Sequence, residues 1–297
     1  MTQALPRLLT IGSLNLDHVY RVPHFVRPGE TLASVAYQCG PGGKGLNQSV
    51  ASARAGARVA HAGCIGSDGD ALLQVLEDSG VDTARILRIP GATGHAIIQV
   101  NESGENAILL HAGANHRVDV EMGQEWFKGY ESGDWLLLQN ETSAVPELIR
   151  EANKRGLSVV FNPAPMTSAV HGYPLELVDL MVLNQTEAVE LSGEEDEAAA
   201  LAVLAARCPG TEFVLTLGER GCRHRHGETE FEIPAERVEA VDTTAAGDCF
   251  VGYLVAGLAE GQSRPSALQL ATRAAALTVQ RPGAADSIPW RRDLTQG

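Results

Sequence analysis

The chain has 297 residues, of which 44% are hydrophobic and 20% are charged, and its formal net charge is −14. This length supports one large α/β domain or two modest ones with a substantial core, and the acidic balance argues against a nucleic-acid-binding protein. No apolar run approaches the ~20 residues of a membrane-spanning helix, and the first residues lack a secretory signal pattern. Five cysteines without a CxxC pair do not indicate a disulfide framework or structural zinc, so we expect a cytoplasmic protein.

The first half of the chain mixes strands and helices without a regular order. Continuous apolar residues predict a buried strand over 7–17, and no G-x-G-x-x-G follows it, which removes the main support for a dinucleotide site. Further strands are expected at 18–25, 31–38 and 57–66, helices at 45–56 and 70–80, and a hairpin over 95–111. The strands near 16–40 and 94–112 do not fit the core alternation and predict a small inserted sheet, which would be a lid over one end.

From about residue 134, short apolar strands alternate regularly with helical segments. Strands are expected at 134–140, 157–165, 177–184 and 212–218, and helices at 145–156, 186–193, 196–208, 246–261 and 266–280. This alternation is typical of parallel βαβ units. We therefore predict an α/β fold with a doubly wound, mostly parallel sheet flanked by helices. Ligands of such sheets bind beyond the carboxyl ends of the strands.

The glycine-rich segment 39–50, "CGPGGKGLNQSV", has the composition of a phosphate-binding loop. It fails the P-loop pattern at both ends, because Gln38 stands where the first glycine is required and Gly45 follows Lys44 where Ser or Thr would bind Mg²⁺. The segment is therefore not a P-loop, and its flexible backbone and single ammonium group serve another kind of site.

A second segment of small residues, "VDTTAAGDCFVGYL", runs from 241 to 254 into a helix. Backbone N–H groups left uncovered at a helix N-terminus form an anion site, which the helix dipole favours. Asp248 in the first turn could accept a proton from an attacking hydroxyl while the anion site holds phosphoryl oxygens. The alternative is that Asp248 is only an exposed first-turn carboxylate, which would contribute under about 1 kcal/mol.

Polar side chains also lie at the ends of two predicted strands in the N-terminal half of the chain. Asn15 and Asp17, two residues apart in an extended segment, would point the same way and suit the vicinal hydroxyls of a sugar. The alternative for this pair is an ordinary Asx turn. Glu141 stands at the end of another strand.

Two segments could contact a nucleotide and its metal ion. Asn184 and Glu187 lie between a strand and a helix, where they could hold a hydrated Mg²⁺, or Asn184 could simply cap the helix. The 216–221 segment, "TLGERG", could pass close to an adenine or its phosphates, or be a plain hairpin turn. Each of these signals is weak alone, but all lie at strand ends.

Nine segments, in order and over nearly the whole chain, resemble the ribokinase family of sugar and nucleoside kinases. They are "GSLNLDHV", "PGET", "GPGGKGLNQ", "NESGENAILLHAGAN", "NPAP", "LNQTE", "TLGERG", "VDTTAAGDCFVGYL" and "RPGAADSIPW". The resemblance implies one kinase domain over 1–297, with lid strands inserted at about 16–40 and 94–112. The lid of this family often forms the dimer interface, so a homodimer is implied.

The resemblance also implies roles for individual residues. Asp248 matches the catalytic base, and Ala245, Ala246 and Gly247 match the anion hole. The positions that match sugar contacts, besides Asp248, are Asn15, Asp17, Gly42, Gly43, Lys44, Asn47 and Glu141. Those that match nucleotide contacts are Asn184, Thr216, Gly218, Gly221 and Gly247, and Glu187 matches the acid associated with Mg²⁺ through water. Those that match a monovalent-cation site are Asp242, Thr244, Thr278, Arg281, Gly283 and Ser287. By this comparison, the 39–50 segment binds the sugar and not the nucleotide.

Together, these expectations describe an enzyme that phosphorylates D-ribose at O5 with ATP and Mg²⁺ and is activated by K⁺ or a similar ion. Alternatives are a kinase for a ketohexose or ribonucleoside, or a non-catalytic sugar-binding regulator. The 5% aromatic content disfavours a nucleoside, and the intact base and anion hole disfavour a regulator. The chain departs from the family at His95 in the lid hairpin and at Pro282 and Asp286 near the cation site.

Overall fold

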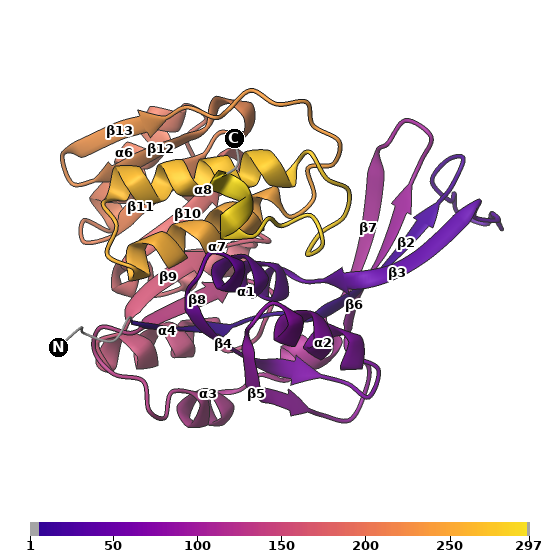
Figure 1. The fold of residues 1–297 in the computed structure, drawn as a ribbon, viewed down its shortest axis with the longest axis horizontal. Helices are drawn as coiled ribbons and strands as arrows, with labels where there is room; N and C mark the ends of the chain where they lie inside the picture. Colours follow the sequence, from indigo (N-terminus) through magenta and orange to yellow (C-terminus); the bar gives the residue numbers. More distant parts are fainter. Residues whose placement is uncertain (1–5, 296–297) are drawn as a thin grey trace.

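The computed structural model describes residues 6–295 and contains one large and one small β-sheet with helices on both faces of the large sheet (Figure 1). The large sheet has nine strands in the order β13-β12-β11-β10-β9-β8-β1-β4-β5. Its strands are β1 (Arg7–Ile11), β4 (Arg58–Ile65), β5 (Asp82–Arg88), β8 (Trp135–Gln139), β9 (Ser158–Asn162), β10 (Leu180–Asn184), β11 (Glu212–Thr216), β12 (Cys222–His226) and β13 (Thr229–Ile233). All pair in parallel except β12 and β13, which are antiparallel.

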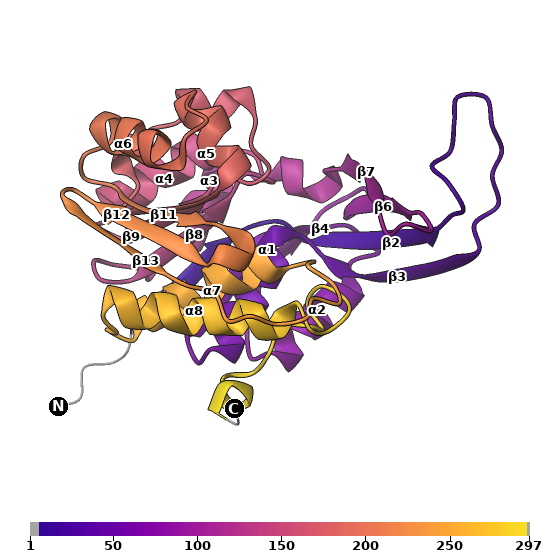
Figure 2. The same cartoon turned by 90° about the horizontal axis from the view of Figure 1, so that it is seen from above.

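The helices form one layer on each face of this sheet, as Figure 2 shows. One layer contains α1 (Lys44–Arg54), α2 (Asp70–Asp78), α7 (Ala246–Ala259) and α8 (Arg264–Thr278), and the other contains α3 (Val120–Trp126), α4 (Val145–Lys154), α5 (Gln185–Ser192) and α6 (Glu197–Arg207). Each layer buries its own hydrophobic core against the sheet, which is why the central strands are apolar on both faces. Among residues 6–295, no helix is long and apolar enough to cross a membrane.

Helices α1 and α7 approach each other very closely. A Cβ atom on Gly252 would lie 2.7 Å from the carbonyl oxygen of Gln48, so only glycine fits at this crossing. The contact lies one turn beyond Asp248 and brings the start of α7 against the polar residues of α1. Helix packing therefore determines which side chains meet at the site.

The small sheet projects from the side of the core (Figures 1 and 2). It contains β2 (Asn15–Arg21), β3 (Ala36–Gly42), β6 (Gly94–Val100) and β7 (Asn106–His111) in the order β3-β2-β6-β7. Its apolar side chains remain exposed at several positions, with Ile108 at 58% and Leu109 at 68%. This sheet and the doubly wound core confirm the predicted fold class.

Several predicted elements were wrong in detail. The strand expected over 7–17 is two strands, because the chain leaves the large sheet after Ile11 and enters the small sheet at Asn15. The strand expected at 31–38 begins only at Ala36. The regular parallel alternation ends at β11, after which β12 and β13 add an antiparallel hairpin. Strand β5 and the seven-residue helix α3 were missed, since β5 has no continuous apolar run and α3 is short.

Candidate active site

Asp248 lies in the first turn of α7 and is 8% exposed, so the alternative that it is only an exposed first-turn carboxylate is wrong. The Asn47 side chain donates to its Oδ2 (2.9 Å), and the Gln48 side chain donates to its Oδ1 (3.0 Å). Each carboxylate oxygen is thus held by one amide of α1. The family resemblance had indicated Asn47, whereas Gln48 was missed.

The residues before Asp248 form a tight helix start. Ala245 adopts a left-handed conformation with φ 59°, and the Ala246 N–H donates to the Thr243 carbonyl (3.3 Å). A Cβ on Gly247 would have no atom within 4 Å, so the space above it is open. The first N–H groups of a helix lack intrahelical acceptors, and an anion placed here would also be favoured by the helix dipole.

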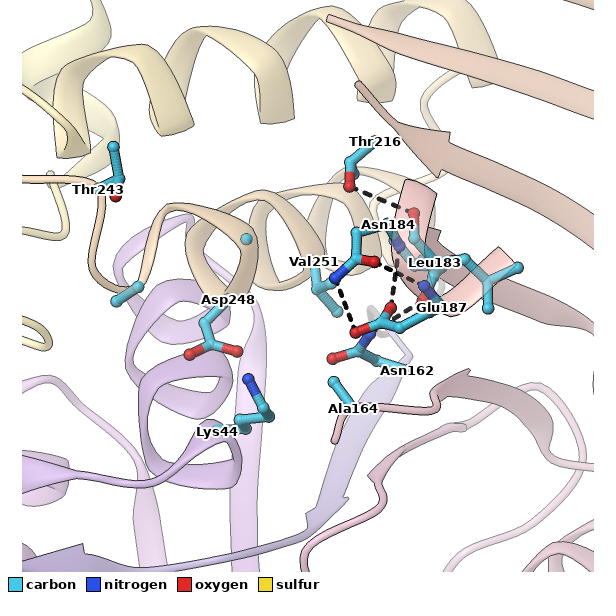
Figure 3. Close-up of a pocket in the computed structure, with 13 residues that line it drawn as sticks. Lys44, Asn162, Ala164, Leu183, Asn184, Glu187, Thr216, Thr243, Asp248 and Val251 are labelled. Atoms are coloured by element: carbon cyan, nitrogen blue, oxygen red, sulfur yellow. Dashed lines mark hydrogen bonds between the residues drawn. The ribbon is translucent and has the colours of Figure 1, made fainter. Parts of the chain in front are cut away.

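Lys44 extends toward Asp248, as Figure 3 shows. The Asp248 carboxylate, followed by that of Glu141, raises the pKa of Lys44, although burial opposes this. The Lys44 backbone N–H donates to Glu141 Oε2 (2.9 Å), and the Ser13 hydroxyl donates to the same oxygen. Burial raises the pKa of Glu141. The charges of the two carboxylates therefore favour the cationic form of the Lys44 ammonium.

Asp17 and Asn15 lie on one face of β2, as their spacing predicted. Burial, helped by the nearby Glu141 and Asp248 carboxylates, raises the pKa of Asp17 to about 7. Its carboxylate lies directly above Gly42, where a Cβ atom would be 2.1 Å from Oδ2. These contacts bring the small sheet and the glycine-rich segment to the same site.

Asn115 holds Asn15 in place and was missed by the sequence analysis. Its Nδ2 donates to Asn15 Oδ1 (2.7 Å), while its Oδ1 accepts from the Leu14 N–H (3.0 Å). Asn115 is the last residue of "NESGENAILLHAGAN", one of the segments that resemble the ribokinase family. That resemblance was the signal that could have indicated Asn115.

Asn184 and Glu187 form a reciprocal capping box at the start of α5. The Asn184 side chain accepts from the Glu187 N–H (2.8 Å), and Glu187 Oε2 accepts from the Asn184 N–H (2.9 Å). The helix-cap alternative is therefore correct as local structure. Burial raises the pKa of Glu187, which lines the same cavity as Asp248.

Glu187 also fits the requirements of a water-mediated Mg²⁺ contact. Its oxygens keep free lone pairs, and Mg²⁺ commonly uses few carboxylates, several waters and substrate phosphates. Over residues 6–295, no cluster of three or more His, Cys, Asp or Glu side chains is arranged to hold a metal ion directly. Any Mg²⁺ here would depend on nucleotide oxygens and water.

A cavity of about 230 Å³ lies between Lys44, Asp248 and the start of α5 (Figure 3). Its lining residues are Lys44, Asn162, Ala164, Val182, Leu183, Asn184, Glu187, Thr216, Thr243, Ala245, Gly247, Asp248 and Val251. Thr216 thus contributes to the wall, but Gly218 and Gly221 do not. Those two glycines form the turn between β11 and β12 with φ 58° and 99°, as the hairpin alternative described.

The segments expected to hold a monovalent cation lie side by side. Asp242 Oδ2 accepts from the Gly283 N–H (2.9 Å), and Oδ1 accepts from the Thr244 N–H (2.9 Å). Although burial opposes it, the hydrogen bond from the Thr244 hydroxyl (2.6 Å) and the two backbone bonds lower the pKa of Asp242. The other expected positions make their own bonds: the Thr278 hydroxyl donates to Ala274 O, the Ser287 hydroxyl donates to Ala284 O, and Arg281 pairs with Asp293.

Comparisons with known proteins agree with this geometry. The model of the pfkB family carbohydrate kinases matches residues 5–291. A ribokinase of Haemophilus influenzae is 40% identical over 299 residues, covering 97% of each chain. The structure of a Cryptococcus neoformans ribokinase in complex with ADP superposes with a TM-score of 0.86 at 34% identity, covering 98% of this chain and 99% of that one. That of an Arabidopsis thaliana ribokinase complexed with ribose and ATP gives 0.87 at 27% identity, covering 98% of both. Asp248, Lys44 and the N-terminus of α7 meet at one cavity, and the family match covers nearly the whole chain. This chain therefore belongs to the pfkB family of carbohydrate kinases.

Proposed function

We propose that this carbohydrate kinase transfers the γ-phosphoryl group of ATP to O5 of D-ribose, giving ribose 5-phosphate and ADP. The observation that carries the proposal is the Asp248 carboxylate, which is held by two amides beside the open helix start at Gly247. The names of the relatives support ribose as the acceptor and ATP as the donor.

In the proposed reaction, Asp248 accepts the proton of the O5 hydroxyl as O5 attacks the γ-phosphorus. The bond from phosphorus to the β,γ-bridging oxygen breaks, and its electron pair leaves with ADP. The segment from Ala245 to Gly247 at the start of α7 forms the anion hole for phosphoryl oxygens, and Lys44 neutralises charge. Mg²⁺ bound with ATP, near Glu187, would supply further charge neutralisation.

The sugar would lie between the small sheet and α1, with the sheet as its lid. Asn15, Asp17, Asn47 and Glu141 provide donors and acceptors, with Gly42 and Gly43 allowing close backbone approach. Asn47 Oδ1 is buried and has no partner within the described residues, so it is available to a sugar hydroxyl. A site built this way rejects an analogue that lacks one hydroxyl, because a buried polar group is left unpaired.

The nucleotide would occupy the rest of the cavity, near Asn184, Thr216 and Gly247, with the turn at Gly218 and Gly221 beyond the cavity wall.

A monovalent cation would stiffen the anion hole from the side away from the cavity, where Asp242 bonds the loop at Gly283. The carbonyl groups of Thr244, Thr278, Arg281 and Gly283 would suit a large, weakly hydrated ion.

The small sheet would also form a homodimer interface. Its edge strand β7 exposes Ile108, Leu109 and Leu110, and exposed apolar strand edges are usually covered by a partner.

All five cysteines are free, which supports a cytoplasmic location.

A coupled assay of ADP release with ribose, 2-deoxyribose, fructose and adenosine tests the assignment. We expect ribose to have the highest kcat/KM, because its hydroxyls match the polar groups that surround the site. A higher kcat/KM for fructose or adenosine would select the ketohexose or ribonucleoside alternative. No ADP release with any of these acceptors would favour the non-catalytic regulator.

A further inference from the structure

We propose that Gln48 is a positioning residue that fixes the orientation and ionised form of the Asp248 carboxylate. The proposal rests on the proposed role of Asp248 as the base. Gln48 acts through Asp248 and does not contact the sugar or the nucleotide.

Every hydrogen-bonding group of the Gln48 amide is used within the protein. Its Nε2 donates to Asp248 Oδ1 (3.0 Å) and to Asn162 Oδ1 (3.1 Å), and its Oε1 accepts from Gln139 Nε2 (2.8 Å). Two amide hydrogens and one carbonyl oxygen are thereby engaged. Asn47 differs, because its Oδ1 remains free for substrate.

The network allows only one orientation of the Gln48 amide. Asn162 Nδ2 donates to the Val182 carbonyl (2.9 Å), so Asn162 must present its oxygen to Gln48. A flipped Gln48 amide would turn its oxygen toward both Asn162 Oδ1 and the Asp248 carboxylate. The end of strand β9 therefore determines that a donor faces the base.

Burial makes this arrangement costly unless it is complete. Gln48 is 0% exposed and all its amide groups are paired, whereas Gln139, which is 1% exposed, leaves its Oε1 without a partner among the described residues. A buried amide group without a partner destabilises the fold. A purely apolar residue at position 48 would bury no polar group that requires a hydrogen-bond partner. Hydrogen bonds to a carboxylate favour its charged form and restrict its rotation, which are the two properties that a general base needs.

The test compares Gln48→Met, Gln48→Glu and the control Ser49→Ala by kcat, both KM values, the pH profile of kcat and thermal unfolding. Ser49 is a buried α1 neighbour that bonds His61 and does not touch the network. For Gln48→Met we expect kcat to fall by about 10–100-fold, with both KM values within about threefold, because a misaligned base slows chemistry more than binding.

The pH profile separates positioning from simple packing, because the other ionisable groups near Asp248, namely Lys44, Asp17, Glu141 and Glu187, are the same in every variant. Gln48→Met should move the acid limb of kcat to higher pH, since the charged carboxylate loses a donor. Gln48→Glu is isosteric and puts a second carboxylate next to the first, so its acid limb should move further in the same direction. An unchanged acid limb in both folded variants would overturn the proposal.

Two further variants keep the test decisive. If Gln48→Met does not fold, Gln139→Leu removes only the donor that orients the Gln48 amide, and it should move the limb in the same direction. If Asp248→Asn keeps wild-type turnover, the proposed base is wrong. If Asp248→Asn is inactive while the Gln48 and Gln139 variants match Ser49→Ala, the base stands and the positioning role of Gln48 is overturned.

Discussion

Replacing Gly42 by alanine should displace one carboxylate of the sugar site and leave the fold intact. The new Cβ atom would lie 2.1 Å from Asp17 Oδ2 and 2.3 Å from its Cγ. Ordinary van der Waals contact begins at 3.4 Å, so the carboxylate must move by about 1.3 Å. Gly42 does not have a positive φ, so alanine introduces no backbone strain.

A displacement of this size is large for a substrate contact. Misplacing a reacting or binding group by about 1 Å can cost roughly 100-fold in rate, because bound substrates depend on close alignment. We therefore expect kcat/KM for ribose to fall by about 100-fold, mainly through KM. The KM for ATP should change little, because Asp17 is not among the residues that line the nucleotide cavity.

Gly40→Ala is the matched control. Gly40 is in the same strand and pairs directly with Asp17, but a Cβ atom there would have no neighbour within 4 Å. The two variants share the same chemical change, and only Gly42→Ala places a methyl group against Asp17. Steady-state kinetics with varied ribose, together with circular dichroism to confirm folding, give the comparison. A Gly42→Ala enzyme with the same kcat/KM as Gly40→Ala would refute the placement of Asp17 at the sugar.

The remaining predictions concern the base, pH, salt and assembly. Asp248→Asn should lower kcat by about 10²–10⁴-fold and destabilise the fold by roughly 1–3 kcal/mol, because one amide donor of Asn47 or Gln48 loses its acceptor; retention of over a tenth of the turnover would exclude it as the base. Burial raises the Asp17 pKa to about 7, so the native state holds a proton that the unfolded chain releases above about pH 4, and stability should fall as pH rises from about 4 to 7; Asp17→Asn should flatten this fall in Tm, and an unchanged pH dependence would contradict it. Turnover should be higher in KCl than in NaCl or choline chloride at equal ionic strength, because a large cation would stiffen the anion hole, and equal rates would rule out the cation site. Sedimentation at micromolar concentration should give a dimer, whereas a monomer would reject the small-sheet interface.

The sequence alone determined the features that depend on neighbouring residues. Alternating apolar segments predicted the doubly wound core, and the helix cap at Asn184, one of the two alternatives given for that residue, is present in the structure. The small residues before Asp248 likewise predicted a helix start there. These features follow from local backbone preferences, which are readable over a few residues.

The tertiary structure decided which distant segments meet. Apolar periodicity could not reveal that the chain changes sheets after Ile11, because both strands have similar local patterns. Nor could it reveal that Asp248 is buried, since that follows from α1 packing against α7 about 200 residues away. The partners of Gln48 come from the ends of two strands and a helix, and a buried amide is recognisable as functional only when all its partners are known. Such long-range pairings depend on which surfaces pack together, and that information is distributed over the whole chain.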